Sequence, residues 1–205
     1  TTEISKLVRK YNNHKSMNTN QRAFTYIDNF ATDVRQITEN RFFSDIYSGN
    51  AKGKMNGTFE RIVADSVLLC SYPNEYRKES RKNFEWLNEN ACISDFENLG
   101  KLFTRLTDSL ETTTETKALF DVKHTHIFIA LFKALIIESG RKDNEFSGFL
   151  DWFVNGGNEI EVDGKTWDML NSTNHSTRDP GVVRGKLDYL VALMEQYSEE
   201  IKKAA

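Results

Sequence analysis

The chain has 205 residues, of which 39% are hydrophobic and 28% charged, as is typical of a globular domain. Its net charge of −3 excludes a protein that binds nucleic acid through an overall positive charge. The longest apolar run, residues 127–137, is interrupted by Lys133 and is shorter than the about 20 residues of a membrane-spanning helix, so no membrane partner is expected. Two cysteines, Cys70 and Cys92, lie in apolar helical surroundings, which predicts reduced core thiols in a cytoplasmic protein.

Apolar residues recur every three or four positions along most of the chain, which predicts amphipathic helices. Only 2 prolines are present, and their scarcity favours long helices because proline removes a backbone hydrogen bond. The segment 118–138 is the most apolar and is expected to form the central helix. The predicted helices cover residues 23–37, 42–47, 58–72, 77–89, 94–110, 118–138, 146–153 and 180–203.

Residues that favour helix ends support two of these boundaries. Asn18 is followed three residues later by Gln21, a pair that can form a reciprocal N-terminal cap. Asp179 precedes Pro180, an arrangement typical of the start of a helix. The segment 49–57 is rich in glycine and asparagine and is a predicted loop.

The segment 159–167 alternates apolar and acidic residues around Asp163 and Gly164, a dipeptide typical of tight hairpin turns. It forms either a small β-hairpin or a turn that leads into another helix. We therefore expect an all-α protein, with one compact domain of about eight helices over residues 1–205. In this domain residues 1–20 form a junction segment that leads into the first long helix.

No catalytic motif is recognised in the sequence. His124 and His126 cannot bind one metal ion from a helix, because residues two positions apart point in divergent directions, and a zinc site needs further converging ligands. Cys70 and Cys92 lack the C-x-x-C spacing of a metal or redox site. The sequence also lacks a nucleophile elbow and a phosphate-binding loop. We therefore expect no catalytic residue, no metal and no cofactor.

A local basic cluster stands out in the predicted helix 77–89. The spacing of i, i+1, i+4 and i+5 gathers four basic side chains on one side of such a helix. Glutamates are interleaved with them, so the cluster is either a solvated helix face or a surface that contacts phosphate. These candidate nucleic-acid-binding residues are Arg77, Lys78, Arg81 and Lys82.

The predicted loop 171–181 concentrates polar residues immediately before the last helix. Asp179 and the hydroxyl groups of this loop can cap the helix. Alternatively, Arg178 and Arg184 can bind phosphate, because the amides and the dipole of a helix start attract anions. The loop therefore either caps the helix or binds an anion, and Arg178 and Arg184 are further candidate nucleic-acid-binding residues.

The segment 7–24, LVRKYNNHKSMNTNQRAF, resembles a junction in a large bacterial family of ParB-like nuclease proteins, which includes restriction enzymes of the GmrSD type. In that family a ParB-like nuclease-fold domain precedes a helical domain. The segments 54–69 and 176–190 also resemble helices of this helical domain. The residues that carry the junction resemblance are Leu7, Val8, Arg9, Asn12, Met17, Gln21, Arg22 and Ala23.

The resemblance implies that this chain is the helical C-terminal part of such a protein, without its catalytic half. The D-G-Q turn of the family's catalytic domain is missing, since the only Asp-Gly pair, Asp163 and Gly164, is followed by Lys165. The implied function is non-catalytic recognition, positioning or self-association beside a ParB-like domain in cis. DNA and further copies of the chain are the candidate partners, and restriction or defence is the implied setting.

Two alternative functions remain open. A stand-alone interaction module, for instance of phage origin, would display exposed aromatic residues, although the same residues can equally form the core. An all-helical enzyme would assemble His124, His126 and carboxylates in a deep polar pocket with perturbed ionisable groups. The aromatic candidates for an exposed patch are Phe42, Phe43, Trp152 and Trp167.

Overall fold

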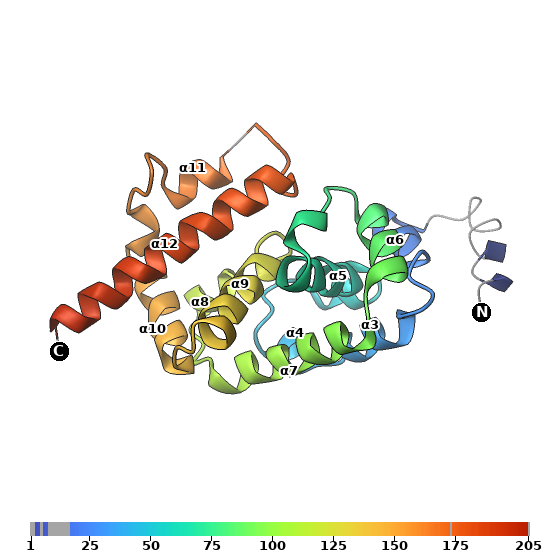
Figure 1. The fold of residues 1–205 in the computed structure, drawn as a ribbon, viewed down its shortest axis with the longest axis horizontal. Helices are drawn as coiled ribbons and strands as arrows, with labels where there is room; N and C mark the ends of the chain where they lie inside the picture. Colours follow the sequence, from blue (N-terminus) through green and yellow to red (C-terminus); the bar gives the residue numbers. More distant parts are fainter. Residues whose placement is uncertain (1–2, 5, 8–16, 173, 205) are drawn as a thin grey trace.

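The computed structural model describes residues 3–4, 6–7, 17–172 and 174–204. This part of the chain folds into packed helices with no β-sheet (Figure 1), which confirms the predicted all-α class. The junction residues Val8, Arg9 and Asn12 lie outside the described part, so the junction resemblance stays a prediction.

The long predicted helices in the middle and at the end of the chain agree well with α5, α7 and α12, because their apolar stripes are regular. Among the helices of the described part, none combines the length and apolarity that a bilayer crossing needs. The α-helices are α2 (Thr19–Phe24), α3 (Ala31–Thr38), α4 (Phe42–Asp45), α5 (Thr58–Ser71), α6 (Ser80–Asn90), α7 (Ile93–Ser109), α8 (Thr114–Ala118), α9 (Thr125–Phe132), α10 (Asp143–Val154), α11 (Trp167–Asn171) and α12 (Pro180–Ala204). The remaining turns are the 3₁₀-helices η2 (Ala51–Lys54), η3 (Pro73–Glu75) and η5 (Gly157–Glu159), and the π-helix η4 (Lys133–Glu138).

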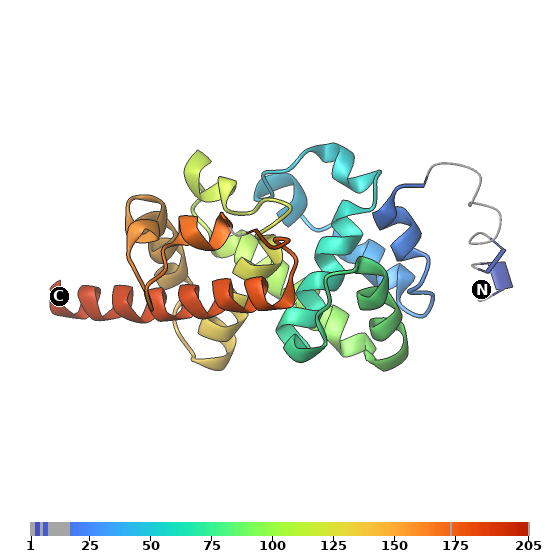
Figure 2. The ribbon, with the colours of Figure 1, turned by 90° about the horizontal axis from the view of Figure 1, so that it is seen from above.

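The pair α5 and α9 forms the centre of the fold. Helix α5 packs against α9, α3, α6 and α7, and every residue of α9 is buried. Helix α12 runs along one side of the molecule against α9 and α11, and its C-terminal end extends past the other helices (Figures 1 and 2). The start of α12 therefore lies close to the middle of the protein, where α5 and α9 meet.

The predicted helix 118–138 is formed only over residues 125–138, as α9 and the π-helix η4 that follows it directly, whereas α8 ends at Ala118 and residues 119–124 form a turn. Asp121 lies between α8 and α9 and explains the break. Its Oδ1 accepts hydrogen bonds from the backbone amides of Lys123 and His124, each at 2.8 Å, and so competes with continuation of the helix. The prediction of one continuous central helix is therefore wrong, and the break places His124 directly before the first residue of α9.

The segment predicted as a hairpin or a turn contains one isolated β-bridge, between Val162 and Lys165. Asp163 and Gly164 have positive φ angles of 50° and 74°, as the predicted tight turn requires. The side chain of Thr166 then caps α11, which prevents the second strand from continuing. Of the two interpretations, the turn that leads into a helix is correct.

Both predicted helix caps are confirmed. Asn18 and Gln21 exchange side-chain-to-backbone hydrogen bonds of 3.0 Å in each direction and form a capping box at the start of α2. Oδ1 of Asp179 accepts a hydrogen bond of 3.0 Å from the amide of Gly181, and Pro180 is the first residue of α12. Local sequence signals thus fix these two helix starts.

The prediction of two core thiols is wrong for Cys92. Cys92 is exposed at the start of α7, where its backbone N–H donates to the carboxylate of Asp95 at 2.9 Å. Cys70 is partly buried near the end of α5, and burial raises the pKa of its thiol to about 12. Both cysteines are free thiols.

The aromatic candidates for an exposed patch pack in or against the hydrophobic core instead. Phe43 stacks on Phe59 with ring centroids 4.4 Å apart, and the centroid of Trp152 lies 5.4 Å from that of Tyr197. Of the two roles considered for these residues, core packing is therefore correct, and they do not form the exposed patch that an interaction module would need. Their exposures are 0% for Phe42, 8% for Phe43 and 6% for Trp167, and Trp152 is half-buried.

Candidate functional site

The four basic residues predicted around the helix 77–89 all lie exposed at the start of α6. Arg77 and Lys78 precede the helix, and Arg81 and Lys82 belong to its first turn. The guanidinium of Arg81 also lies over the ring of Tyr26, 4.6 Å from its centroid. The structure thus brings the four side chains to one end of α6, although only two of them are within the helix.

Glutamates pair with three of these four side chains. Each paired side chain is more than a third exposed, so each ion pair contributes little to stability. Lys78 forms no ion pair within the described residues. These contacts agree with a solvated face, but weak exposed pairs can also exchange a carboxylate for a phosphate. The pairs are Arg77–Glu75 at 3.0 Å, Arg81–Glu85 at 2.8 Å and Lys82–Glu79 at 3.6 Å.

Arg184 joins this group because Arg184 and Arg77 contact the same residue. Nη2 of Arg184 donates to Oδ1 of Asn74, 110 positions earlier in the chain, at 3.3 Å. Nη1 of Arg77 donates to the carbonyl oxygen of Asn74 at 2.7 Å. The second turn of α12 therefore adjoins the start of α6. The basic surface is defined here as Arg77, Lys78, Arg81, Lys82 and Arg184.

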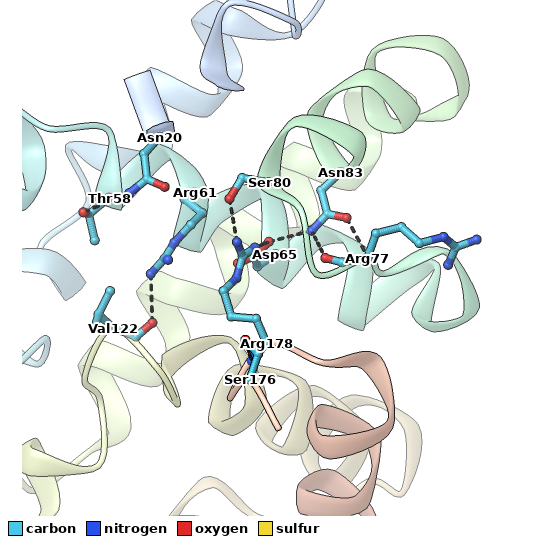
Figure 3. Close-up of polar contacts among 10 residues, drawn as sticks. All are labelled: Asn20, Thr58, Arg61, Asp65, Arg77, Ser80, Asn83, Val122, Ser176 and Arg178. Atoms are coloured by element: carbon cyan, nitrogen blue, oxygen red, sulfur yellow. Dashed lines mark hydrogen bonds and ion pairs between the residues drawn. The ribbon is translucent and has the colours of Figure 1, made fainter. Parts of the chain in front are cut away.

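Arg178 points inward and is not part of the basic surface. Its Nη2 lies 2.9 Å from each carboxylate oxygen of Asp65, and its Nη1 donates to Oγ of Ser80 at 2.6 Å (Figure 3). The side chain of Arg178 is 18% exposed and that of Asp65 only 2%. Burial opposes the charge of Arg178, but the carboxylate of Asp65 and the hydroxyl group of Tyr76 together outweigh it and raise the pKa of Arg178. The arginine is therefore engaged in a buried ion pair.

Asn83 completes the contacts around this ion pair. Its Nδ2 donates to Oδ1 of Asp65 at 2.8 Å and to the carbonyl oxygen of Arg77 at 2.9 Å, and its Oδ1 accepts from the amide of Arg77 at 2.8 Å (Figure 3). The ion-pair cluster joins α5, α6 and the loop before α12, and so it holds the basic surface in place. Its members are Asp65, Ser80, Asn83 and Arg178.

A second guanidinium lies next to the ion-pair cluster. Arg61, one helical turn before Asp65 on α5, donates from Nη2 to the carbonyl oxygen of Val122 at 3.0 Å (Figure 3). Burial lowers the pKa of Arg61, and the nearby charge of Arg178 lowers it further, whereas Asp65 raises it. Two guanidiniums therefore share the charge of one carboxylate in the interior.

Two further polar residues, Tyr76 and His126, are buried beside these arginines. Tyr76 is 1% and His126 2% exposed, and their rings stack with centroids 5.9 Å apart. Burial raises the pKa of Tyr76 and lowers that of His126 to about 4, so both are neutral near pH 7. The side chains of Tyr76 and Arg178 are hydrogen-bonded to each other. Nε of Arg61 and Nε2 of His126 are buried and have no hydrogen-bond partner within the described part of the chain.

His124, directly before α9, belongs to a different cluster. Its Nδ1 lies 2.9 Å from Oδ1 of Asp121, and its Nε2 lies 3.1 Å from Nζ of Lys186. Nζ of Lys186 also donates to Oδ1 of Asn171 at 2.6 Å and lies 5.3 Å from the centroid of the Trp167 ring. Burial of Lys186, which is 0% exposed, lowers its pKa to about 8. A substrate cannot reach this amine without a movement of the surrounding helices.

The two histidines of the H-x-H pair thus face different parts of the structure, as their spacing predicts. His124 contacts residues of α11 and α12, whereas His126 stacks on Tyr76. Within the described ranges, no group of three His, Cys, Asp or Glu residues is arranged to hold a metal ion. Among the described residues, His124 and His126 therefore belong to two separate polar clusters.

Two hollows of the surface lie away from these clusters. One of about 850 Å³ is formed along α3 and α7, and includes Asp33, Phe96 and Gly100. The other, of about 380 Å³, lies between α7 and the π-helix and is lined by Cys70 and Ile137, among other residues. None of the candidate nucleic-acid-binding residues lines either hollow.

Sequence reasoning missed the ion-pair cluster and the second guanidinium. Arg61 and Asp65 are two charged residues, four positions apart, in a helix whose other residues are mostly buried and apolar. Charged residues at such positions are almost never buried without a partner. This pattern is a usable signal, but it does not identify the partner, because Arg178 lies 113 positions away from Asp65.

No protein-family model, curated protein or solved structure matches this chain. The functional proposal therefore depends on the positions and charges of the described side chains.

Proposed function

We propose that this chain is a non-catalytic helical domain that binds the phosphate backbone of nucleic acid through the basic surface. The observation that carries the proposal is the shared contact of Arg77 and Arg184 with Asn74. This contact joins basic side chains from two distant parts of the chain into one exposed group. A protein with a net charge of −3 can bind a polyanion only through such a local concentration of positive charge.

The energetics of the exposed ion pairs support exchange with phosphate. Glu75, Glu79 and Glu85 stay more than a third exposed, so little free energy is lost when a phosphate replaces them. Binding to a duplex also releases counterions from its phosphates. The logarithm of the binding constant therefore increases by about 0.9 per neutralised phosphate for each tenfold decrease in salt concentration. The acidic neighbours also predict weak, salt-sensitive binding without sequence preference.

The ion-pair cluster supports this proposal by holding the binding side chains at fixed positions. Asn83 binds both backbone groups of Arg77, and Arg178 ties the loop before α12 to Ser80, the first residue of α6. The start of α6 and the start of α12 therefore keep a fixed relation. Side chains held in this way lose less conformational entropy when they bind a phosphate.

The wider setting of this proposal follows from the family resemblance. We infer that the domain acts beside a ParB-like nuclease-fold domain in cis, which would supply the catalysis, and that it contributes recognition, positioning or self-association. Restriction or defence is the corresponding biological role. Two free thiols fit a cytoplasmic location.

The test is binding of a 20-base-pair duplex, measured by fluorescence anisotropy between 50 and 200 mM salt. A triple variant, Lys78→Glu, Lys82→Glu and Arg184→Glu, should weaken binding at least about tenfold. The slope of the logarithm of the binding constant against the logarithm of salt concentration should become shallower by about 0.9 for each lost phosphate contact. The matched control changes three exposed lysines elsewhere by the same total charge: Lys101→Glu, Lys165→Glu and Lys203→Glu. Absence of duplex binding by the unmodified protein, or an equal loss in the control, would refute the proposal.

A further inference from the structure

We propose that Arg61, Arg178, Tyr76 and His126 form a binding site for a small tetrahedral oxyanion of the phosphate class. This site lies in the interior between α5, α9 and the loop before α12, and its atoms differ from those of the basic surface. The proposal goes beyond duplex binding and does not depend on it.

The first argument is the balance of charge. Arg61 and Arg178 are both cations, and Asp65 is the carboxylate that faces them. Asp65 is already occupied by two contacts from Arg178 and one from Asn83. One positive charge is therefore in excess in a partly buried region, where an uncompensated charge is unfavourable. A bound anion would neutralise it.

The second argument is the set of free hydrogen-bonding atoms. Nε of Arg61 carries an N–H group that has no acceptor among the described residues. The side chains of Arg178 and Tyr76 are hydrogen-bonded to each other, which leaves the phenolic O–H of Tyr76 as a donor. Nε2 of His126 is buried and also has no partner among the described residues. Buried polar atoms are nearly always satisfied, so these unsatisfied groups in one region indicate a ligand with several acceptors.

The third argument concerns the kind of anion. The polar groups of this region come from four elements: Arg61 from α5, Tyr76 from the turn before α6, His126 from α9 and Arg178 from the loop before α12. A tetrahedral oxyanion offers acceptor oxygens in several directions, which a halide or a planar carboxylate offers less well. Guanidinium groups also favour phosphate and sulfate because their N–H groups match the spacing of the oxygens.

An anion can approach this site from the surface near the loop before α12. The side chain of Arg178 is 18% exposed, and Ser176 and Thr177 on the same loop are partly exposed. Figure 3 shows Arg178 reaching from this loop towards Asp65, while Arg61 extends from α5 towards Val122. A free phosphate or the terminal phosphate of a nucleotide could use this approach.

The experiment is isothermal titration with inorganic phosphate, with chloride at matched ionic strength as the reference. The unmodified protein should bind phosphate with saturation. Arg61→Met, which removes the surplus cation, should weaken phosphate binding at least about tenfold, because a charge-assisted hydrogen bond is lost. Tyr76→Phe should weaken it several-fold, and Lys165→Met, on a distant turn, should leave it unchanged.

Circular dichroism shows whether each variant is folded, so a loss of phosphate binding can be distinguished from a loss of structure. Arg178→Met is not used, because it also breaks the ion pair with Asp65. Phosphate should raise the melting temperature of the unmodified protein and not that of Arg61→Met. Tighter binding of adenosine monophosphate than of phosphate would assign a nucleotide, and equal binding a free anion. A lack of saturable phosphate binding, or identical binding by Arg61→Met, would overturn the proposal whatever the result with duplex DNA.

Discussion

Replacement of Asp65 by Asn should destabilise the protein severely. The amide preserves the size of the side chain but removes the negative charge, and so it leaves Arg178 and Arg61 in the interior without a counterion. Asp65 is 1% exposed and accepts three hydrogen bonds of 2.8 to 2.9 Å, two from Arg178 and one from Asn83. Loss of one partner of a buried ion pair costs about 3 to 5 kcal/mol of the free energy of unfolding.

That loss is a large fraction of the total stability, which is about 5 to 15 kcal/mol for a typical domain. A chain of this size should lose about 2 to 4 °C in melting temperature per kcal/mol, so a shift of roughly 6 to 20 °C is expected. Urea denaturation followed by tryptophan fluorescence and circular dichroism measures the free energy, and a thermal scan in chloride buffer measures the shift.

The exposed pair of Arg81 and Glu85 provides the matched control. Glu85→Gln makes the same chemical change at a pair of exposed side chains and should cost less than about 1 kcal/mol. The double variant Asp65→Asn with Arg178→Met should lose less free energy of unfolding than the two single variants lose together. Each single variant already loses the interaction between Asp65 and Arg178, so adding their losses counts that interaction twice. A cost below about 1 kcal/mol for Asp65→Asn would refute the argument that a buried charge is left uncompensated.

Two further predictions concern Lys186 and the cysteines. The pKa of Lys186 is lowered from 10.5 to about 8, so between these values the unfolded state binds more protons than the folded state. The free energy of unfolding should therefore rise with pH in this window, by up to about 3 kcal/mol. Urea denaturation from pH 7 to 10 should show this rise in the unmodified protein and not in Lys186→Met. The same dependence of the unfolding free energy on pH in both proteins would contradict the prediction. Exposed Cys92 should react with a thiol reagent at least about tenfold faster than Cys70, whose thiol pKa is raised to about 12 by burial, as mass spectrometry of the labelled peptides can establish. Equal labelling rates in the native protein would be inconsistent with the burial of Cys70.

The fold class was predictable because apolar spacing and local caps act over short distances. Asn18 with Gln21, and Asp179 with Pro180, mark helix starts within a few residues, and the structure has helices where these signals predict them. The break before α9 was harder to predict, because the surrounding apolar stripe is nearly continuous. One side chain, Asp121, ends the preceding turn by binding two backbone amides.

The site was less predictable than the fold, because its contacts join distant parts of the chain. The exposed basic residues near α6 could be proposed from their spacing alone. The inward orientation of Arg178 could not, since it depends on Asp65, which is 113 positions away. For the same reason, the sequence did not indicate that Arg184 reaches Asn74.

The pairing of Asp65 with Arg178 also has a consequence for how the molecule comes apart. Detachment of α12 would separate two opposite charges that are stable in the interior only as a pair, so release of the C-terminal helix and loosening of α5 and α6 should be one cooperative event. Amide protons in these three helices should then exchange with solvent at a common rate. A chain truncated before Ser176 would leave the buried carboxylate of Asp65 without the two hydrogen bonds that Arg178 donates, and it should not persist as a native fragment.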